Sequence, residues 1–155
     1  MHYRANAADL RLDIDDVLAV PLAETRAFLI AGNNLTASPS RDATLFAAEE
    51  ARRRGASVVL DLDLRADQWY DPRAYGVAVR SALRLSDIVI GTQDEIKAAA
   101  GTARFDVEHA QHNEARVEGD LAAAVEVLLA LGPEVLVEKR GSAGARVHLS
   151  DGSGP

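Results

Sequence analysis

The stretch VVLDLDLRADQW, residues 58–69, decides the fold class. Its first half is an apolar strand sequence in which Asp61 and Asp63 alternate with leucines. Residues two apart on a strand share one face, so the two carboxylates lie on the same side near the strand's carboxyl end. A nearly continuous apolar run of this kind is typical of a parallel strand. Arg65 and the chain's only tryptophan, Trp69, follow directly, so polar and aromatic side chains gather just beyond the strand.

The same pattern continues on both sides of this strand. Short apolar runs at residues 26–32 and 87–91 predict two more strands, and residues 134–141 and 145–152 predict a pair around a glycine-bearing turn. Helical stretches separate the earlier strands, which predicts right-handed crossovers and a parallel sheet covered by helices on both faces. The expected fold class is therefore α/β, a three-layer α/β/α Rossmann-like sheet.

The helix after the first predicted strand has clear end signals. Ser38 is placed to cap its N-terminus, Pro39 occupies the first helical position, and Gly55 ends it. The arginines at 52–54 fall in its last turn, where positive charge favours the helix dipole. We therefore interpret them as dipole partners rather than as a basic binding patch.

Composition narrows the classes of function. A chain of 155 residues with 48% hydrophobic and 26% charged residues is typical of one globular domain. It has no apolar run long enough to cross a membrane and no apolar core of a signal peptide near its first residue. A net charge of -7 argues against a nucleic-acid-binding surface. The absence of cysteine suits the cytoplasm, which is the expected location.

Polar residues follow four of the predicted strands. The segments are GNNLT with Asn33 and Asn34, DLDLR, GTQDE, and EKRGSAG. In an open parallel sheet, ligands bind beyond the carboxyl ends of the strands. Because these ends meet at one edge of the sheet, we expect the four segments to converge on one ligand site.

The order of these segments resembles the middle of the ribokinase (phosphofructokinase-B) family of sugar kinases. The stretch from Asp61 to Trp69 is similar to the family's Asp-x-Asn-x-Arg-x-x-x-Trp pattern, with Asp63 in place of the asparagine. GTQDE is similar to its Asn-x-x-Glu motif, with Thr92 replacing the asparagine and Glu95 kept. KRGSAG matches its Lys-x-Gly-x-x-Gly turn, and YRANAADL at the start resembles a substrate-side lid.

The resemblance implies a role for each matching residue. Arg65 and Arg4 would hold the carboxylate of a sugar acid, Tyr3 would offer the sugar a ring face and a hydroxyl, and Asp63 would contact the substrate. Glu95 would organise Mg²⁺ through water. The ATP side is implied for Lys139, Gly141 and Gly144. The implied cofactors are thus ATP and Mg²⁺, and the implied small-molecule partner is a sugar acid.

Each of these residues also has a simpler interpretation. Arg65 could be an exposed arginine paired with Asp63 or Asp67, Glu95 could cap its helix, and the glycines could form a plain hairpin turn. His109 and His112 lie in an acidic stretch, which we interpret as a solvated connection rather than a metal site. His148 belongs to no cluster of metal-ligating residue types in the sequence.

The two departures from the family motifs, Asp63 and Gly91-Thr92, are similar to the 5-dehydro-2-deoxygluconokinase branch, which serves inositol catabolism. A 2-keto-3-deoxygluconate kinase or another sugar kinase is the alternative, and a non-catalytic, ligand-binding or self-associating scaffold is an alternative of another class. The family's N-terminal Gly-Gly motif and its Gly-Ala-Gly-Asp segment, which carries the catalytic base, do not occur in the 155 residues. We therefore expect one incomplete ribokinase-like domain over 1–155, with a lid-type segment at 1–12 and a core at 26–155. It should form homo-oligomers and have no kinase activity alone.

Overall fold

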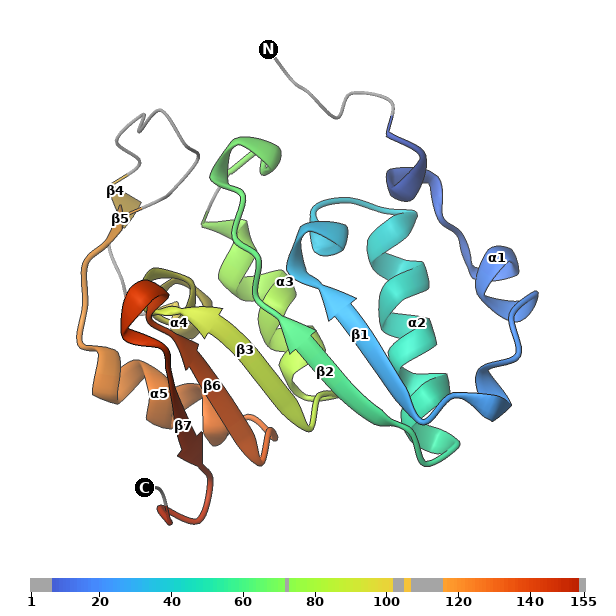
Figure 1. The fold of residues 1–155 in the computed structure, drawn as a ribbon. Helices are drawn as coiled ribbons and strands as arrows, with labels where there is room; N and C mark the ends of the chain where they lie inside the picture. The colour runs from blue at the N-terminus through green and yellow to red at the C-terminus, as the bar shows by residue number, and fades with distance from the viewer. Residues whose placement is uncertain (1–6, 72, 102–104, 107–115, 154–155) are drawn as a thin grey trace.

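A computed structural model describes residues 7–71, 73–101, 105–106 and 116–153 of the chain. Its centre is a five-stranded sheet in the order β1-β2-β3-β6-β7 (Figure 1). The first four strands are parallel, and β7 runs antiparallel to β6. The sheet strands are β1 (Ala27–Ala31), β2 (Ser57–Asp61), β3 (Ile88–Thr92), β6 (Val135–Lys139) and β7 (Ala145–Leu149). The α/β class expected from the sequence is confirmed.

Five α-helices and several single turns complete the described part of the chain. The helices are α1 (Ile14–Leu18), α2 (Ser40–Arg53), α3 (Ala74–Leu83), α4 (Gln93–Ala100) and α5 (Leu121–Leu129). The 3₁₀ turns are η1 (Ala8–Arg11), η2 (Leu22–Glu24), η3 (Gly32–Leu35), η4 (Ala66–Gln68) and η5 (Gly141–Ala143). A separate antiparallel ribbon pairs β4 (Phe105–Asp106) with β5 (Arg116–Val117). No helix in these ranges has the length and apolarity needed to span a bilayer.

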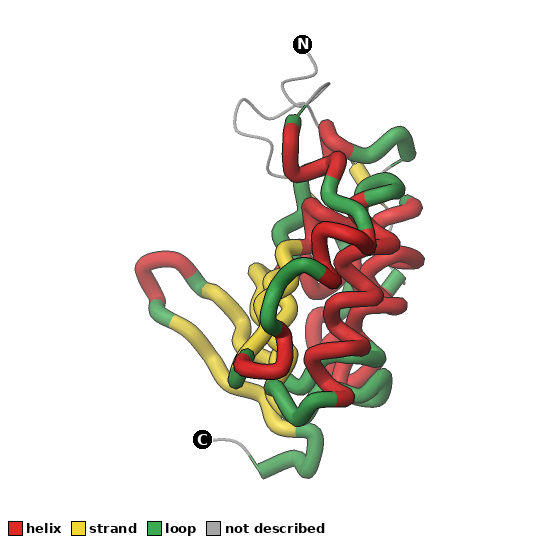
Figure 2. The backbone as a smooth tube through the Cα atoms, turned by 90° about the vertical axis from the view of Figure 1, so that its right-hand side faces the viewer, coloured by secondary structure: helices red, strands yellow, loops and turns green. Residues whose placement is uncertain are grey.

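The helices α2, α3, α4 and α5 lie on one side of the sheet (Figure 2). The reason is the direction of the chain, which steps the same way along the sheet from β1 to β2, β3 and β6. Crossovers of one handedness that all step in one direction leave their helices on the same face. The expectation of helices on both faces is therefore not met within the described residues, which form two of the three expected layers.

The main core lies between the sheet and these helices. Val58, Leu60, Val89 and Leu136 point into it from the strands and are fully buried. The opposite face of the sheet is also apolar, with Leu29, Val59, Ile88, Val135 and Leu149 in one row across the five strands. Leu29 in this row is 65% exposed. This face, which no helix of the described residues covers, thus has the apolar composition of a buried face.

Helix α2 begins differently from the sequence prediction. Its N-cap is Pro39, which makes no side-chain capping bond, and Ser38 instead accepts a hydrogen bond from Arg41 at 3.0 Å. The proposed Ser38 cap is therefore wrong. The C-terminal end agrees better, because the helix ends at Arg53 and Gly55 follows with φ of 84°. Arg53 and Arg54 near this end pair with Glu50.

Candidate functional site

The carboxyl end of β2 continues into a sharp bend. The Leu62 N–H still donates to the Ile90 carbonyl at 2.8 Å, so the chain follows β3 for one residue beyond the strand. Asp63 then adopts a left-handed conformation with φ of 33°. Among residues other than glycine, asparagine and aspartate tolerate this conformation best. The backbone thus gives one physical reason for an aspartate at this position.

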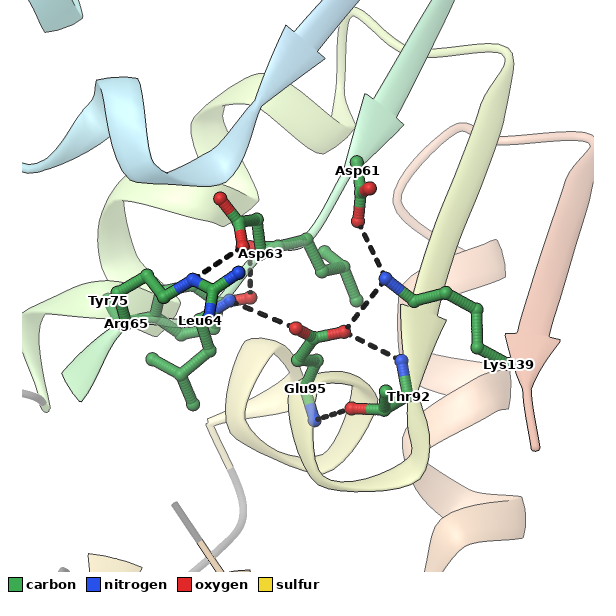
Figure 3. Close-up of polar contacts among 9 residues, drawn as sticks. Asp61, Asp63, Leu64, Arg65, Tyr75, Thr92, Glu95 and Lys139 are labelled. Carbon is green, nitrogen blue, oxygen red and sulfur yellow. Dashed lines mark hydrogen bonds and ion pairs between the residues drawn. The ribbon is translucent and has the colours of Figure 1, made fainter. Parts of the chain in front are cut away.

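Arg65 follows the bend and lies on the rim of the sheet. Its Nε donates to Asp63 Oδ1 at 2.9 Å, the pairing that the simpler interpretation of the sequence describes (Figure 3). Half of the Arg65 side chain is exposed. Within the described residues its two terminal nitrogens have no hydrogen-bond partner, so one side of the planar fork is available to a carboxylate. The pair with Asp63 fixes the arginine without using that side.

Glu95 joins the beginning of α4 to the end of β2. Its Oε2 accepts from the Thr92 N–H at 2.7 Å, and its own N–H donates to Thr92 Oγ1 at 3.4 Å, which together form a capping box. Its other oxygen, Oε1, accepts from the Leu64 N–H at 3.2 Å (Figure 3). The capping interpretation of Glu95 is therefore confirmed, and the carboxylate also ties the bend of β2 to α4.

Lys139, the last residue of β6, lies between two carboxylates. Its Nζ is 3.0 Å from Asp61 Oδ1 and 3.5 Å from Glu95 Oε2 (Figure 3). Partial burial works against the charged amine, but the hydrogen bond to Asp61 and the charge of Glu95 outweigh it and raise the pKa of Lys139. A cation thus holds together groups from β2, α4 and β6.

Gly141 and Gly144 shape the turn that follows Lys139. Their φ angles of 57° and 81° favour glycine, and a Cβ at either position would meet nothing within 4 Å. The Arg140 N–H donates to the Gly144 carbonyl at 2.8 Å, which closes the turn between β6 and β7. The geometry fits a hairpin turn with open space beside it, and the assignment of this turn to ATP stays a prediction.

A second polar cluster lies on the helix-covered face behind Lys139. Glu138 is buried, and its carboxylate binds Gln93 Nε2 at 2.8 Å and His148 Nε2 at 3.0 Å. Burial acts to raise the pKa of Glu138, but the hydrogen bonds with Gln93 and His148 and the charge of Arg140 outweigh it and lower that pKa. The sequence did not predict this contact between His148 and Glu138. The sequence signal for this cluster was Glu138 itself, a carboxylate at a position of β6 that faces the core.

The structure brings most of the predicted site residues to one edge of the sheet. Asp63, Arg65, Glu95 and Lys139 converge there, with Asp61 added to the group (Figure 3). The sequence did not indicate Tyr75, whose hydroxyl binds the Leu62 carbonyl at 2.9 Å beneath the bend. Asn33, after β1, has a buried Oδ1 without a partner in the described part of the chain. Tyr3, Arg4, His109 and His112 lie outside the described residues.

Two hollows among the described residues lie away from this edge. One hollow of about 470 Å³ lies between α5 and β7, and another of about 660 Å³ lies beside α4 and β5. Neither includes Asp63, Arg65 or Lys139. Within the ranges that the structure describes, no three acidic or histidine side chains are grouped to hold a metal ion directly. Both oxygens of Glu95 already accept hydrogen bonds, and the water-mediated Mg²⁺ role expected for this carboxylate stays a prediction.

Comparison with known proteins gives consistent results. The chain is 33% identical over 150 residues to the 5-dehydro-2-deoxygluconokinase of Photobacterium profundum. The aligned region covers 97% of this chain and 42% of the relative. It is 34% identical over 151 residues to the enzyme of the same name from Halalkalibacterium halodurans, covering 97% of the chain and 41% of the relative. The chain thus spans about two fifths of the length of these relatives.

Solved structures share the fold. Fructokinase from Xylella fastidiosa with bound ATP matches with a TM-score of 0.76 at 20% identity, covering 95% of this chain and 42% of that one. Aminoimidazole riboside kinase from Salmonella enterica matches with a TM-score of 0.71 at 22% identity. This match covers 92% of this chain and 42% of the kinase chain. The sequence profile described as pfkB family carbohydrate kinase matches residues 1–155. With this match, the resemblance seen in the rim motifs is confirmed, and the chain belongs to the pfkB family of carbohydrate kinases.

Proposed function

We propose that this chain forms the sugar-acid and nucleotide-binding rim of a kinase that phosphorylates 5-dehydro-2-deoxygluconate, as in inositol catabolism. The observation that carries the proposal is the placement of Arg65. Its guanidinium lies on the rim with one side unbonded in the described residues, next to the Lys139–Glu95 pair. A planar guanidinium matches the two oxygens of a sugar-acid carboxylate. Relatives at 33–34% identity that bear this enzyme's name support the choice of acid.

The opposite end of the rim suits nucleotide phosphates. Lys139 supplies a positive charge at the end of β6, and the turn through Gly141 and Gly144 leaves room for the backbone to approach a ligand. Glu95 would hold Mg²⁺ through water, and the bound ion would neutralise charge on the transferred phosphoryl group. A fructokinase of the same fold was solved with bound ATP, which supports nucleotide binding at this fold.

The roles of the rim residues are binding and orientation. Arg65 would fix the acid end of the sugar, and Lys139 would balance Asp61 and Glu95 until phosphate and cation arrive. The family's Gly-Ala-Gly-Asp segment, which carries the catalytic base, does not occur in the 155 residues. We therefore propose that these 155 residues bind ligands without measurable phosphoryl transfer, and that a kinase of this family needs further residues for catalysis.

A fluorescence titration tests this proposal. Trp69 is the chain's only tryptophan and packs edge-on against Tyr75, beneath the bend that leads to Arg65. We expect 5-dehydro-2-deoxygluconate and 2-keto-3-deoxygluconate to change its emission with saturation, and neutral D-fructose to bind at least about tenfold more weakly. Equal affinity for the acids and the neutral sugar would contradict the proposal. The ratio between the two acids decides between the two kinase activities.

Lys139→Met is expected to weaken binding of Mg²⁺–ATP by about tenfold, because it removes the cation between two carboxylates at the nucleotide end. The melting temperature should change little, since the ion pair between Lys139 and Asp61 is partly exposed to solvent. Lys97→Met is the matched control, because the chain's other lysine pairs with Asp94 and the Val117 carbonyl. Calorimetric titration with nucleotide measures the effect, and equal losses in both variants would refute a specific role for Lys139.

A second candidate function is a non-catalytic scaffold that self-associates, and the uncovered apolar sheet face favours it. If this face mediates homo-oligomers, Leu29→Lys should shift the chain toward monomer, because it puts a charge where Leu29 is 65% exposed. Sedimentation equilibrium over a tenfold range of concentration measures this shift. Val77→Lys, at a 64% exposed position on α3, is the control and should leave the association unchanged.

A further inference from the structure

The bend after β2 places a left-handed residue just before Arg65. Asp63 has φ of 33° and is the only residue other than glycine with positive φ in the described part of the chain. Such a conformation costs free energy for residues with a Cβ and persists when neighbouring groups fix it. The groups that fix the peptides around Asp63 therefore determine where Arg65 lies.

Tyr75 fixes the peptide on the first side of the bend. This side chain of α3 is completely buried, and its hydroxyl donates to the Leu62 carbonyl at 2.9 Å (Figure 3). Trp69 packs against its ring at right angles, with the ring centroids 5.6 Å apart. Burial, together with the negative charges of Glu95, Asp63 and Asp61, raises the pKa of Tyr75. The phenol thus keeps its proton and remains a donor.

Glu95 fixes the peptide on the other side. Its Oε1 accepts from the Leu64 N–H at 3.2 Å, and its Oε2 is held by the Thr92 N–H. The Leu62 carbonyl and the Leu64 amide are thus each bound by a side chain from a different helix. Asp63 lies between these two anchors, and its carboxylate in turn holds Arg65 Nε.

We propose that Tyr75 is a positioning residue for sugar-acid recognition, which acts by anchoring the Leu62 carbonyl and so setting the direction in which Arg65 presents its guanidinium. The inference rests on the proposed function, in which Arg65 binds the substrate carboxylate. Tyr75 itself is buried beneath the bend and acts through the backbone. Removal of its hydroxyl leaves a buried carbonyl without its partner, so the bend should loosen locally.

Hydrogen exchange in Tyr75→Phe tests the anchor directly. We expect the Leu64 amide to exchange about tenfold faster than in the wild type, after correction for any common change in the amides of β3 and β6. Tyr70→Phe is the matched control, because Tyr70 is fully exposed and near in sequence. An unchanged Leu64 amide, or an increase equal to that of the strand amides, would overturn the proposal.

Ligand binding separates positioning from a general structural role. Tyr75→Phe should weaken sugar-acid binding by about tenfold and leave Mg²⁺–ATP binding within about twofold. Equal weakening of both ligands would overturn the positioning role. If the wild type binds no sugar acid, the proposed function fails, whereas the exchange measurement still decides whether Tyr75 sets the bend.

A pair of variants at Asp63 gives an independent check. Asp63→Gly and Asp63→Ala both remove the carboxylate that holds Arg65, but only glycine adopts φ of 33° without strain. The Leu64 amide should stay protected in Asp63→Gly and lose protection in Asp63→Ala. Equal protection in the two variants would show that the bend does not depend on a left-handed residue and would overturn the proposal.

Discussion

Arg65→Ala is expected to weaken binding of 5-dehydro-2-deoxygluconate by about 100-fold, with almost no change in the stability of the chain. Two charge-assisted hydrogen bonds from a guanidinium to a carboxylate together account for about 2.7 kcal/mol. The pair between Arg65 and Asp63 is half exposed on the arginine side, and surface pairs of this kind contribute little to folding. Calorimetric titration measures the affinity, and thermal unfolding measures the stability.

The chain offers a close control for this experiment. Arg73 also pairs with an aspartate two residues away, Asp71, and its side chain is exposed. Arg73→Ala should therefore leave sugar-acid binding unchanged. Arg65→Lys should recover only part of the affinity, because an ammonium cannot bind both carboxylate oxygens in the fork geometry. A loss of less than about threefold in Arg65→Ala would contradict the role assigned to this side chain.

Gly32→Ala is expected to lower the free energy of unfolding by about 3 kcal/mol or more. Gly32 is buried directly after β1, and a Cβ there would lie 2.0 Å from the Leu62 carbonyl oxygen and 2.8 Å from its carbon. Because these atoms belong to the backbone, β1 and β2 must move apart at the rim. Urea unfolding followed by Trp69 fluorescence measures the loss.

Gly55→Ala separates this clash from the general effect of replacing a glycine. Gly55 has φ of 84°, and a Cβ at this position would meet nothing within 4 Å. Only backbone strain remains, so the loss should be about 1–2 kcal/mol. If Gly32→Ala is no more destabilising than Gly55→Ala, the close approach of β1 to the Leu62 carbonyl is not a constraint on the fold.

The positions of the main strands along the chain could be predicted well from the sequence. The apolar runs at 26–32 and 87–91 correspond to β1 (Ala27–Ala31) and β3 (Ile88–Thr92), with ends that differ by one residue. The reason is that buried parallel strands have a simple pattern, apolar residues followed by glycine or polar residues at the rim. The short ribbon of β4 and β5 was not predicted, because two-residue strands carry no periodic signal.

The covering of the sheet could not be predicted from strand patterns alone. Val59 and Ile90 lie on the uncovered face of the sheet, yet the sequences of their strands are apolar on both faces, a pattern that predicts burial on both sides. Which face receives a helix depends on the direction of each crossover, and that direction is set by strand order rather than by local sequence. The Ser38 cap failed for a similar reason, since Arg41 takes the hydroxyl and α2 begins after Pro39.

The convergence of the rim residues was predictable, but their pairing was not. The rule that ligands bind beyond the carboxyl ends of strands correctly placed Asp63, Arg65, Glu95 and Lys139 at one edge. The contacts of Tyr75 with Leu62 and of Glu95 with Leu64 join residues 13 and 31 positions apart. Such side-chain contacts depend on how α3 and α4 pack on the sheet, which no local motif encodes.

The most direct test of the proposed function is where the sugar acid binds. Amide chemical-shift changes in the ¹⁵N–¹H spectrum of the wild-type chain, titrated with 5-dehydro-2-deoxygluconate, locate the ligand. Changes that saturate together at Leu64, Arg65 and Glu95 are the predicted result. Changes confined to the hollow between α5 and β7, at Val125, His148 and Leu149, would contradict the rim as the sugar-acid site.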